Sequence, residues 1–290
     1  MGRKRGTNNT ENSKQSIRGR FKLTKANYYT TEANEAYFSA SQIKAFNSCE
    51  ARALAEIRGE YVRPETTSLL VGSYYDAAQG GKKSLELFKS EHPELFKKDG
   101  TLKAEFVRAE QMVQRAKSDP VFAAYGKGRK QTVLTGTIFG YPFKAKLDIL
   151  KLTTDKYGEP RIVDDKTCKD FGSMYKEGEG RLSFVRYYQY DLQMAIYQEL
   201  VRQKYGRKLP TFLRCISKED PPDLLLVEIE QKTLDIEMEM LGYKIERYAG
   251  IKAGVVEPAR CGRCPYCRAT KKLDGPVGLD FLELTGGGDE

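Results

Sequence analysis

The stretch "QTVLTGTIFGYPFKAKLDILKL" (residues 131–152), followed by "RIVDDKT" (residues 161–167), decides which fold this chain can adopt. Both segments are rich in β-branched and aromatic residues, and "GYP" at residues 140–142 interrupts the first. The pattern predicts two antiparallel strands joined at "GYP" and a third strand after the turn "TTDKYGEP". Side chains alternate between the two faces of a strand. One face of the second strand should therefore carry Phe143, Ala145, Leu147 and Ile149, and the other Lys144, Lys146 and Asp148.

The third strand places two adjacent aspartates on opposite faces. Asp164 and Lys166 share one face, and Asp165 points away from it. Asp148, on the neighbouring strand, can lie beside Asp164 when the strands pair. Two close carboxylates repel unless a cation lies between them, and oxygen ligands select Mg²⁺ or Mn²⁺. A nearby lysine can orient or deprotonate the water that attacks a phosphodiester, or stabilise the developing charge. The alternative is that both aspartates end strands in solvated turns.

The other elements surround these strands with helices. Helical spacing of apolar residues predicts helices over 39–61, 66–81, 104–116, 183–206 and 232–254. Strand patterns recur at 210–218 and 223–230. The order along the chain is helices, a β-meander, a helix, two strands and a helix. This order predicts a central mixed sheet flanked by helices, so we expect one α/β domain over residues 27–274.

Charge is concentrated at the N-terminus. The chain of 290 residues has a net charge of +9, and residues 1–25 hold eight Lys or Arg and one acid. We expect residues 1–26 to be a disordered basic arm suited to phosphate contacts, or a solubilising tail. Residues 275–290 should be a flexible tail. We find no apolar run near the ~18 residues of a membrane span and no secretory h-region, so we expect a cytoplasmic protein.

The single histidine and the six cysteines limit the possible chemistry. His92 alone argues against Ser-His-Asp catalysis and His-rich zinc sites. "CGRCPYC" brings Cys261, Cys264 and Cys267 within seven residues. Such a cluster needs a fourth ligand to close an iron–sulfur or zinc site, and reduced free thiols are the alternative. Cys168 and Cys215 are expected to be buried small hydrophobes. A basic patch flanks the cluster and is either a phosphate-binding surface or a solvated face: Arg260, Arg263, Arg268, Lys271 and Lys272.

Four motifs in order resemble the PD-(D/E)XK nuclease superfamily. Asp148 followed by "VDDKT" resembles the RecB-like form of the motif, and "QMAIY" supplies Gln193 and Tyr197 of a Q-x-x-x-Y helix motif. "VGSYYDAA" resembles G-x-x-x-H, with Asp76 in place of the histidine. "SASQIKAFNSC" resembles the stretch before the nuclease core. The resemblance covers about residues 37–272 and is closest to phage and prophage RecE-like exonucleases.

The resemblance implies a restriction-endonuclease-like core and Mg²⁺-dependent hydrolysis of DNA. Asp148, Asp164 and the backbone carbonyl of Asp165 would bind the metal, with Asp76 completing its shell. Lys166 would position the nucleophilic water, and Gln193 and Tyr197 would contact the DNA backbone or the nucleophile. Relatives of this type hold a [4Fe–4S] cluster with one distant N-terminal cysteine, and Cys49 stands at that place.

For RecE-like proteins the resemblance further implies 5′→3′ digestion of linear double-stranded DNA by a ring-shaped homo-oligomer in a bacterial host cell. The product, a 3′ single strand, would pass to a phage annealing protein for homologous recombination. The alternatives are an endonucleolytic or CRISPR-associated RecB-like nuclease and a catalytically silent DNA-binding factor. An iron–sulfur redox carrier is disfavoured because no flavin or nicotinamide motif is present.

Overall fold

The computed structural model describes residues 21–273, 275–276 and 278–280. Most of the predicted basic arm and of the predicted C-terminal tail lies outside the described residues. Among the described helices, none has the length and apolar character that crossing a bilayer requires.

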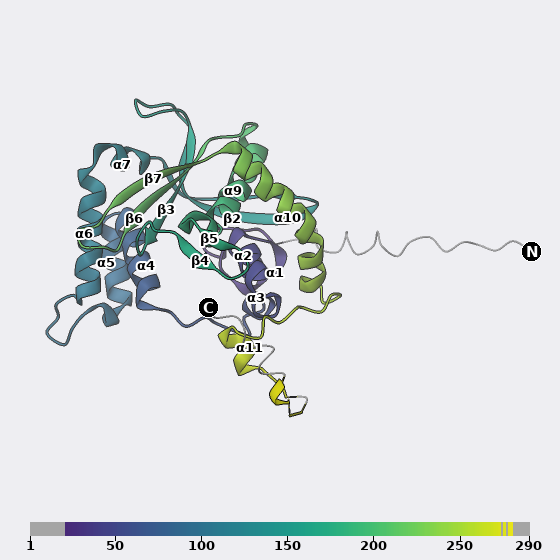
Figure 1. Ribbon diagram of the computed structural model, residues 1–290. Coiled ribbons are helices and arrows are strands. Elements are labelled where there is room, and N and C mark those ends of the chain that lie inside the picture. The colour runs from purple at the N-terminus through teal and green to yellow at the C-terminus, as the bar shows by residue number, and fades with distance from the viewer. Residues whose placement is uncertain (1–20, 274, 277, 281–290) are drawn as a thin grey trace, which may run out of the picture.

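A five-stranded sheet in the order β1-β2-β3-β6-β7 forms the centre of the fold (Figure 1). Its strands are β1 (Arg129–Ile138), β2 (Tyr141–Lys151), β3 (Arg161–Cys168), β6 (Thr211–Ser217) and β7 (Leu224–Ile229). Neighbouring strands pair antiparallel except β3 and β6, which pair parallel. The parallel pair requires a long crossover, which residues 169–210 provide. The sequence prediction of a mixed sheet with a hairpin at "GYP" is confirmed.

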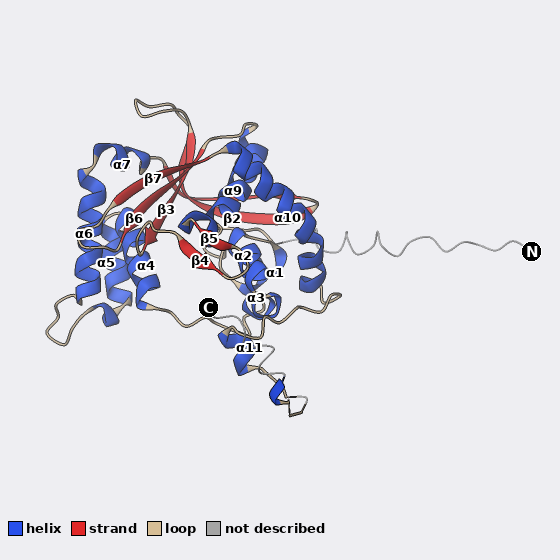
Figure 2. Cartoon of the chain, in the orientation of Figure 1, coloured by secondary structure: helices blue, strands red, loops and turns tan. Residues whose placement is uncertain are grey.

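Helices cover both faces of the sheet, and strand alternation decides which residues meet which layer (Figure 2). In β7, Leu225 and Val227 pack on the core that includes residues of α9 (Tyr190–Tyr205) and α10 (Gln231–Lys252). Leu224 and Leu226 pack on the opposite core. The helices of that second layer are α4 (Thr67–Gln79), α5 (Lys82–Glu91), α6 (Ala104–Ser118) and α7 (Pro120–Tyr125), with a 3₁₀ turn at Pro93–Leu95.

Two helices that were predicted to be continuous are each broken. The predicted helix 39–61 is α2 (Ala40–Ser48) and α3 (Glu50–Ile57), with Cys49 extended between them at φ −165°. The predicted helix 183–206 is α8 (Phe184–Tyr187) and α9, with Gln189 at φ 53°. Neither break contains Gly or Pro, so the local pattern gave no sign of it. The two-stranded hairpin β4 (Met174–Lys176) and β5 (Gly180–Leu182) was not predicted.

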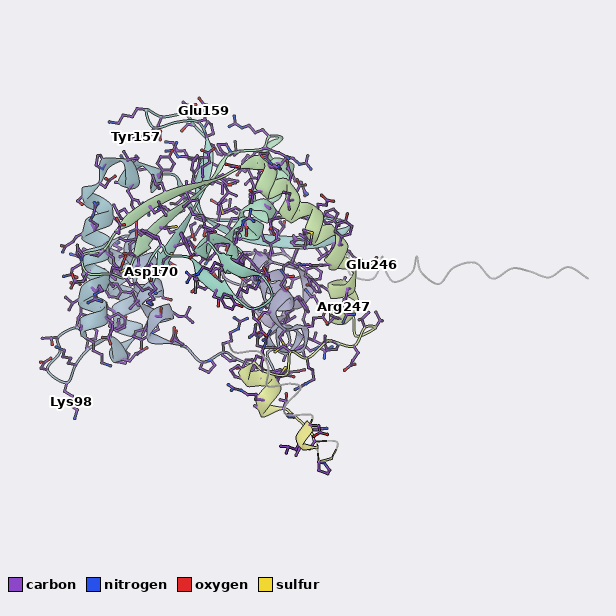
Figure 3. All side chains as sticks on the ribbon, viewed as in Figure 1. Lys98, Tyr157, Glu159, Asp170, Glu246 and Arg247 are labelled. Atoms are coloured by element: carbon purple, nitrogen blue, oxygen red, sulfur yellow. The ribbon has the colours of Figure 1, made fainter. Side chains whose placement is uncertain are left out.

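The C-terminal segment of the described chain packs against α3, a helix near the start of the domain. The helices α1 (Thr31–Ala36) and α3 belong to the N-terminal part, and α11 (Pro265–Ala269) lies against α3 (Figure 1). Arg247, labelled on α10 in Figure 3, donates two hydrogen bonds of 2.7 Å to the carboxylate of Glu50. Glu50 also accepts the backbone N–H of Ala259 at 2.7 Å. These contacts hold the C-terminal segment against the start of α3.

Candidate active site and thiolate cluster

The strands β2 and β3 separate at the predicted acidic pair. Their backbone pairing ends at Ile149 and Val163, one residue before Asp148 and Asp164 would face each other. The side chain of Asp148 replaces the backbone acceptor that β3 lacks at this point, because its Oδ2 accepts the backbone N–H of Asp165 at 3.1 Å. Its Oδ1 accepts Gln131 Nε2 at 3.0 Å. Asp148 is therefore fixed at the point where the sheet opens.

Asp164 is buried, and each of its carboxylate oxygens has a partner. The residue is 1% exposed, and its Oδ1 accepts Gln193 Nε2 at 3.0 Å. Its Oδ2 forms an ion pair with the ammonium of Lys166. Burial, and then the charge of Asp164, raise the pKa of Asp148 well above its usual range. Two neighbouring carboxylates, one of which has a pKa raised by the charge of the other, are an arrangement that a divalent cation would stabilise, so these residues fit Mg²⁺ or Mn²⁺.

The carboxylates of Asp76, Asp148 and Asp164 do not all come within 4.8 Å of one another in the described part of the chain. Asp76 lies on α4 and is exposed, and partial loss of water together with the charge of Asp165 raises its pKa. The helix comes close to β3 at Gly72, where an added Cβ would lie 3.1 Å from Thr167 Oγ1. Gly72 of the G-x-x-x-D motif thus allows the approach, while ligation by Asp76 remains a prediction.

Asp165 points away from this site, as strand alternation predicts. Its carboxylate pairs with the buried guanidinium of Arg214 at 2.5 and 2.8 Å. Arg214 also donates to Phe122 O at 3.2 Å and Gln79 Oε1 at 3.0 Å. A Cβ on Gly126 would lie 1.9 Å from Arg214 Nη1, so glycine is required there. The predicted role of the Asp165 carbonyl remains a prediction.

Gln193 and Tyr197 form one hydrogen-bonded unit on α9. Gln193 Nε2 lies 3.1 Å from Tyr197 OH, which lies 3.4 Å from Lys146 O. Tyr197 is 8% exposed, so little of it is accessible, and its role in the site remains a prediction.

Lys44 is a member of the site that sequence reasoning missed. It lies on α2, and its Nζ donates to Gln193 Oε1 at 2.7 Å. This bond turns the amide so that Nε2 faces Asp164. Lys44 and Lys166 both lie over the ring of Tyr190, at 4.8 and 4.7 Å from its centroid. Burial would lower the pKa of Lys166, but the charges of Asp164 and Asp148 outweigh it and raise that pKa.

The four predicted cysteine ligands come together at the junction of the chain ends. The sulfur atoms of Cys49, Cys261, Cys264 and Cys267 all lie within 4.8 Å of one another. Cys49 Sγ is 3.5 Å and Cys261 Sγ is 3.9 Å from Cys267 Sγ. A tetrahedral ion with metal–sulfur bonds of about 2.3 Å has sulfur–sulfur edges of about 3.8 Å, so the spacing fits a single ion. Four thiolates as such are compatible with either a zinc ion or an iron–sulfur cluster.

The cluster favours a thiolate at Cys261 and a thiol at Cys264, whose pKa burial raises to about 11. Partial burial raises the pKa of Cys261, but backbone N–H groups of Cys264 and Arg263 lower it to about 6 overall. Cys168 and Cys215, in contrast, are buried in the main core, as the sequence predicted.

The basic patch around the cluster divides into two groups. Arg260 donates to Cys267 O at 3.3 Å and to the Thr270 hydroxyl. Arg263 pairs with Glu177 in the β4–β5 turn. These two arginines thus make contacts within the protein. Three other side chains are exposed, and their contact with DNA remains a prediction: Arg268, Lys271 and Lys272.

The fold and the site define the class of this protein. A mixed sheet with Asp148 on one strand, Asp164 and Lys166 on the next, and Gln193 on the following long helix is the core of a PD-(D/E)XK domain. The chain belongs to the family described as "PDDEXK-like domain of unknown function", whose model matches residues 39–270.

A solved structure supports the same membership. A protein of Eubacterium rectale, described as a "Putative exonuclease", is 36% identical and superposes with a TM-score of 0.84. The match covers 92% of this chain and 99% of that one. A second structure, SSO0001, is 14% identical over 74% of this chain and 89% of its own, with a TM-score of 0.29. None of the curated proteins compared with the chain matches it.

Proposed function

We propose that this protein is a metal-dependent DNA exonuclease. The observation that carries the proposal is the convergence of Asp148, Asp164 and Lys166 at the point where strands β2 and β3 separate. Family membership and the name of the Eubacterium rectale protein support the reaction class.

Each residue has a defined task in this proposal. Asp148 and Asp164 would hold Mg²⁺ or Mn²⁺, and Asp76 can approach from α4. A bound divalent cation supplies Lewis acidity to the phosphodiester and lowers the pKa of a bound water. Lys166 has three donors and no acceptor as an ammonium, so it can donate to the attacking water or to the developing phosphorane charge. Gln193 holds Asp164 in place.

The test uses linear duplex labelled at each 5′ end and the same DNA as a closed circle, with Mg²⁺ or with EDTA. The expected result is stepwise loss of the linear form alone, abolished by EDTA and by Asp164→Asn. Asp235→Asn is the matched control, because Asp235 is an exposed carboxylate on α10 bound to Lys208. Cleaved circles would identify an endonuclease instead. DNA binding without any cleavage would identify a silent binding factor.

We further propose 5′→3′ polarity, a ring-shaped homo-oligomer and transfer of the single strand to an annealing protein. These proposals rest on the resemblance to RecE-like proteins. The order in which label is lost from the 5′ and 3′ ends tests polarity. Mass measurement in solution tests the oligomer, and a monomer would overturn the ring.

We propose that the four cysteines bind a structural metal centre that holds the chain ends together. The sulfur spacing favours a single zinc ion over the [4Fe–4S] cluster that the resemblance implies. A cluster places four irons and four sulfides between the thiolates, so its ligand sulfurs must lie further apart. Metal analysis of protein purified without oxygen decides the matter: about one zinc per chain supports the spacing argument, and about four irons with acid-labile sulfide overturns it.

A further inference from the structure

A stack of tyrosine rings leads from the catalytic lysine to the surface. Lys166 Nζ lies 4.7 Å from the ring centroid of Tyr190, which is half-buried. Tyr188 stacks on Tyr190 with centroids 5.6 Å apart and planes at 26°. Tyr187 meets Tyr188 edge-on at 5.1 Å. The outer ring, Tyr188, is 43% exposed, so an aromatic surface lies one ring beyond the ring that Lys166 contacts.

A strained backbone position creates this stack. Residues two apart in a helix lie about 200° apart around its axis, so they do not face each other. Gln189 interrupts the helix at φ 53°, which non-glycine residues rarely adopt. Its side chain is held by Asn47 Nδ2, which donates to Gln189 Oε1 at 2.6 Å. The kink brings Tyr188 and Tyr190 to the same side, and strain of this kind gathers at functional sites.

The surroundings of the stack suit a nucleic acid strand. Lys169 follows β3 with its side chain 95% exposed, next to Asp170, which Figure 3 labels beside the hairpin. Arg186 on α8 and Arg181 on β5 are both exposed, and α8 contacts both strands of the hairpin. Exposed aromatic rings interleaved with basic side chains are the means by which proteins bind unpaired nucleotides.

We propose that Tyr188 is a stacking platform for an unpaired base of the DNA end, next to the nucleotide whose phosphate reaches Asp148 and Asp164. This inference rests on the proposed nuclease function and adds the substrate state: the terminal base leaves the duplex before its phosphodiester is cut. Stacking on Tyr188 offsets the loss of base stacking in the duplex.

The test measures base stacking directly, without cleavage. A duplex with a mismatched end carries 2-aminopurine, whose emission falls when it stacks, at the unpaired end or well inside the duplex. Binding is followed in EDTA for the wild type, Tyr188→Phe, Tyr188→Leu and the control Tyr243→Leu, since Tyr243 on α10 is 74% exposed. Thermal unfolding of each variant confirms that the fold is retained.

We expect quenching of the end probe with the wild type, Tyr188→Phe and Tyr243→Leu. Loss of the ring in Tyr188→Leu should remove the quenching and weaken binding to the mismatched end about 5- to 150-fold. Quenching and affinity in Tyr188→Leu equal to those of the wild type would overturn the inference. The proposed nuclease function would still stand if the wild type digests DNA. An equal loss in Tyr243→Leu would show general surface binding and also overturn it. A wild type that digests no DNA with Mg²⁺ removes the proposed function, and the inference with it.

Discussion

Replacing Lys44 with methionine should separate activity from stability. Lys44 Nζ donates to Gln193 Oε1 at 2.7 Å, and Gln193 Nε2 donates to Asp164 at 3.0 Å. Methionine keeps the length and apolar stem of the side chain but removes the donor. The Gln193 amide then loses the contact that fixes its orientation, and a flipped amide would turn its oxygen toward a carboxylate.

The size of the effect follows from the kind of bond that is lost. At pH 6.5, below the pKa of about 7 that burial gives Lys44, the donor is an ammonium, and a hydrogen bond involving a charged group contributes about 1.5–3 kcal/mol. Since about 1.4 kcal/mol corresponds to a factor of ten in rate, kcat should fall about 10- to 150-fold. KM should change little if Lys44 acts through Gln193 and does not touch DNA.

Stability should respond in the opposite direction. Burial, and then the charge of Lys166, lower the pKa of Lys44 to about 7, whereas an unfolded lysine has a pKa of about 10.4. Between these values the unfolded chain binds more protons, so stability rises with pH, and the cost of Lys44 is greatest below pH 7. Lys44→Met should therefore unfold at a temperature no lower than the wild type at pH 6.5.

The assay compares kcat, KM and unfolding temperature for the wild type, Lys44→Met and Lys232→Met. Lys232 is an exposed lysine on α10, so its replacement should change none of the three. Two results would refute the reasoning. One is a kcat for Lys44→Met within about twofold of the control. The other is a fall of several degrees in unfolding temperature, which would make Lys44 a structural residue.

Three further changes test the surrounding structure. Arg214→Met leaves the buried Asp165 carboxylate unpaired, which should cost about 3–5 kcal/mol and lower the unfolding temperature by about 6–20 °C; an unchanged melt would contradict the buried pair. Cys49→Ser removes one of four thiolates, so metal analysis should find the centre lost, and retained metal would exclude Cys49 as a ligand. Burial lowers the pKa of Lys252 to about 7, so the free energy of unfolding measured in urea should rise from pH 7 to pH 9. Lys252→Met should reduce that rise. An identical rise in the variant would show that Lys252 does not titrate in this range.

The sequence predicted the sheet and the acidic pair because both follow from short-range rules. A hairpin has a turn signal, and a strand has a period of two. From these alone Asp164 and Asp165 had to face opposite sides, and pairing of the two strands could bring Asp148 beside Asp164. The structure adds that the pairing of β2 and β3 ends at this point, which the strand pattern does not contain.

The remaining site residues have no local signal. Lys44 looks like a solvated position on an amphipathic helix, and only the approach of α2 to α9 gives it a role. The breaks at Cys49 and Gln189 lack Gly or Pro, so helical periodicity runs through them. Tertiary contacts fix both: Cys49 lies among the other cysteines, and Gln189 is held by Asn47.

The adjacent aspartates of β3 perform complementary tasks because they face opposite layers. The Asp165 side chain ties the strand to Arg214 and, through it, to Phe122 of the α4–α7 layer. The backbone N–H of the same residue donates to Asp148 Oδ2. The ion pair on one face therefore fixes the strand that orients Asp148 on the other. Asp164 lies on the same strand, so the ion pair of Asp165 and the bond to Asp148 also fix the position of the Asp164 carboxylate beside Lys166.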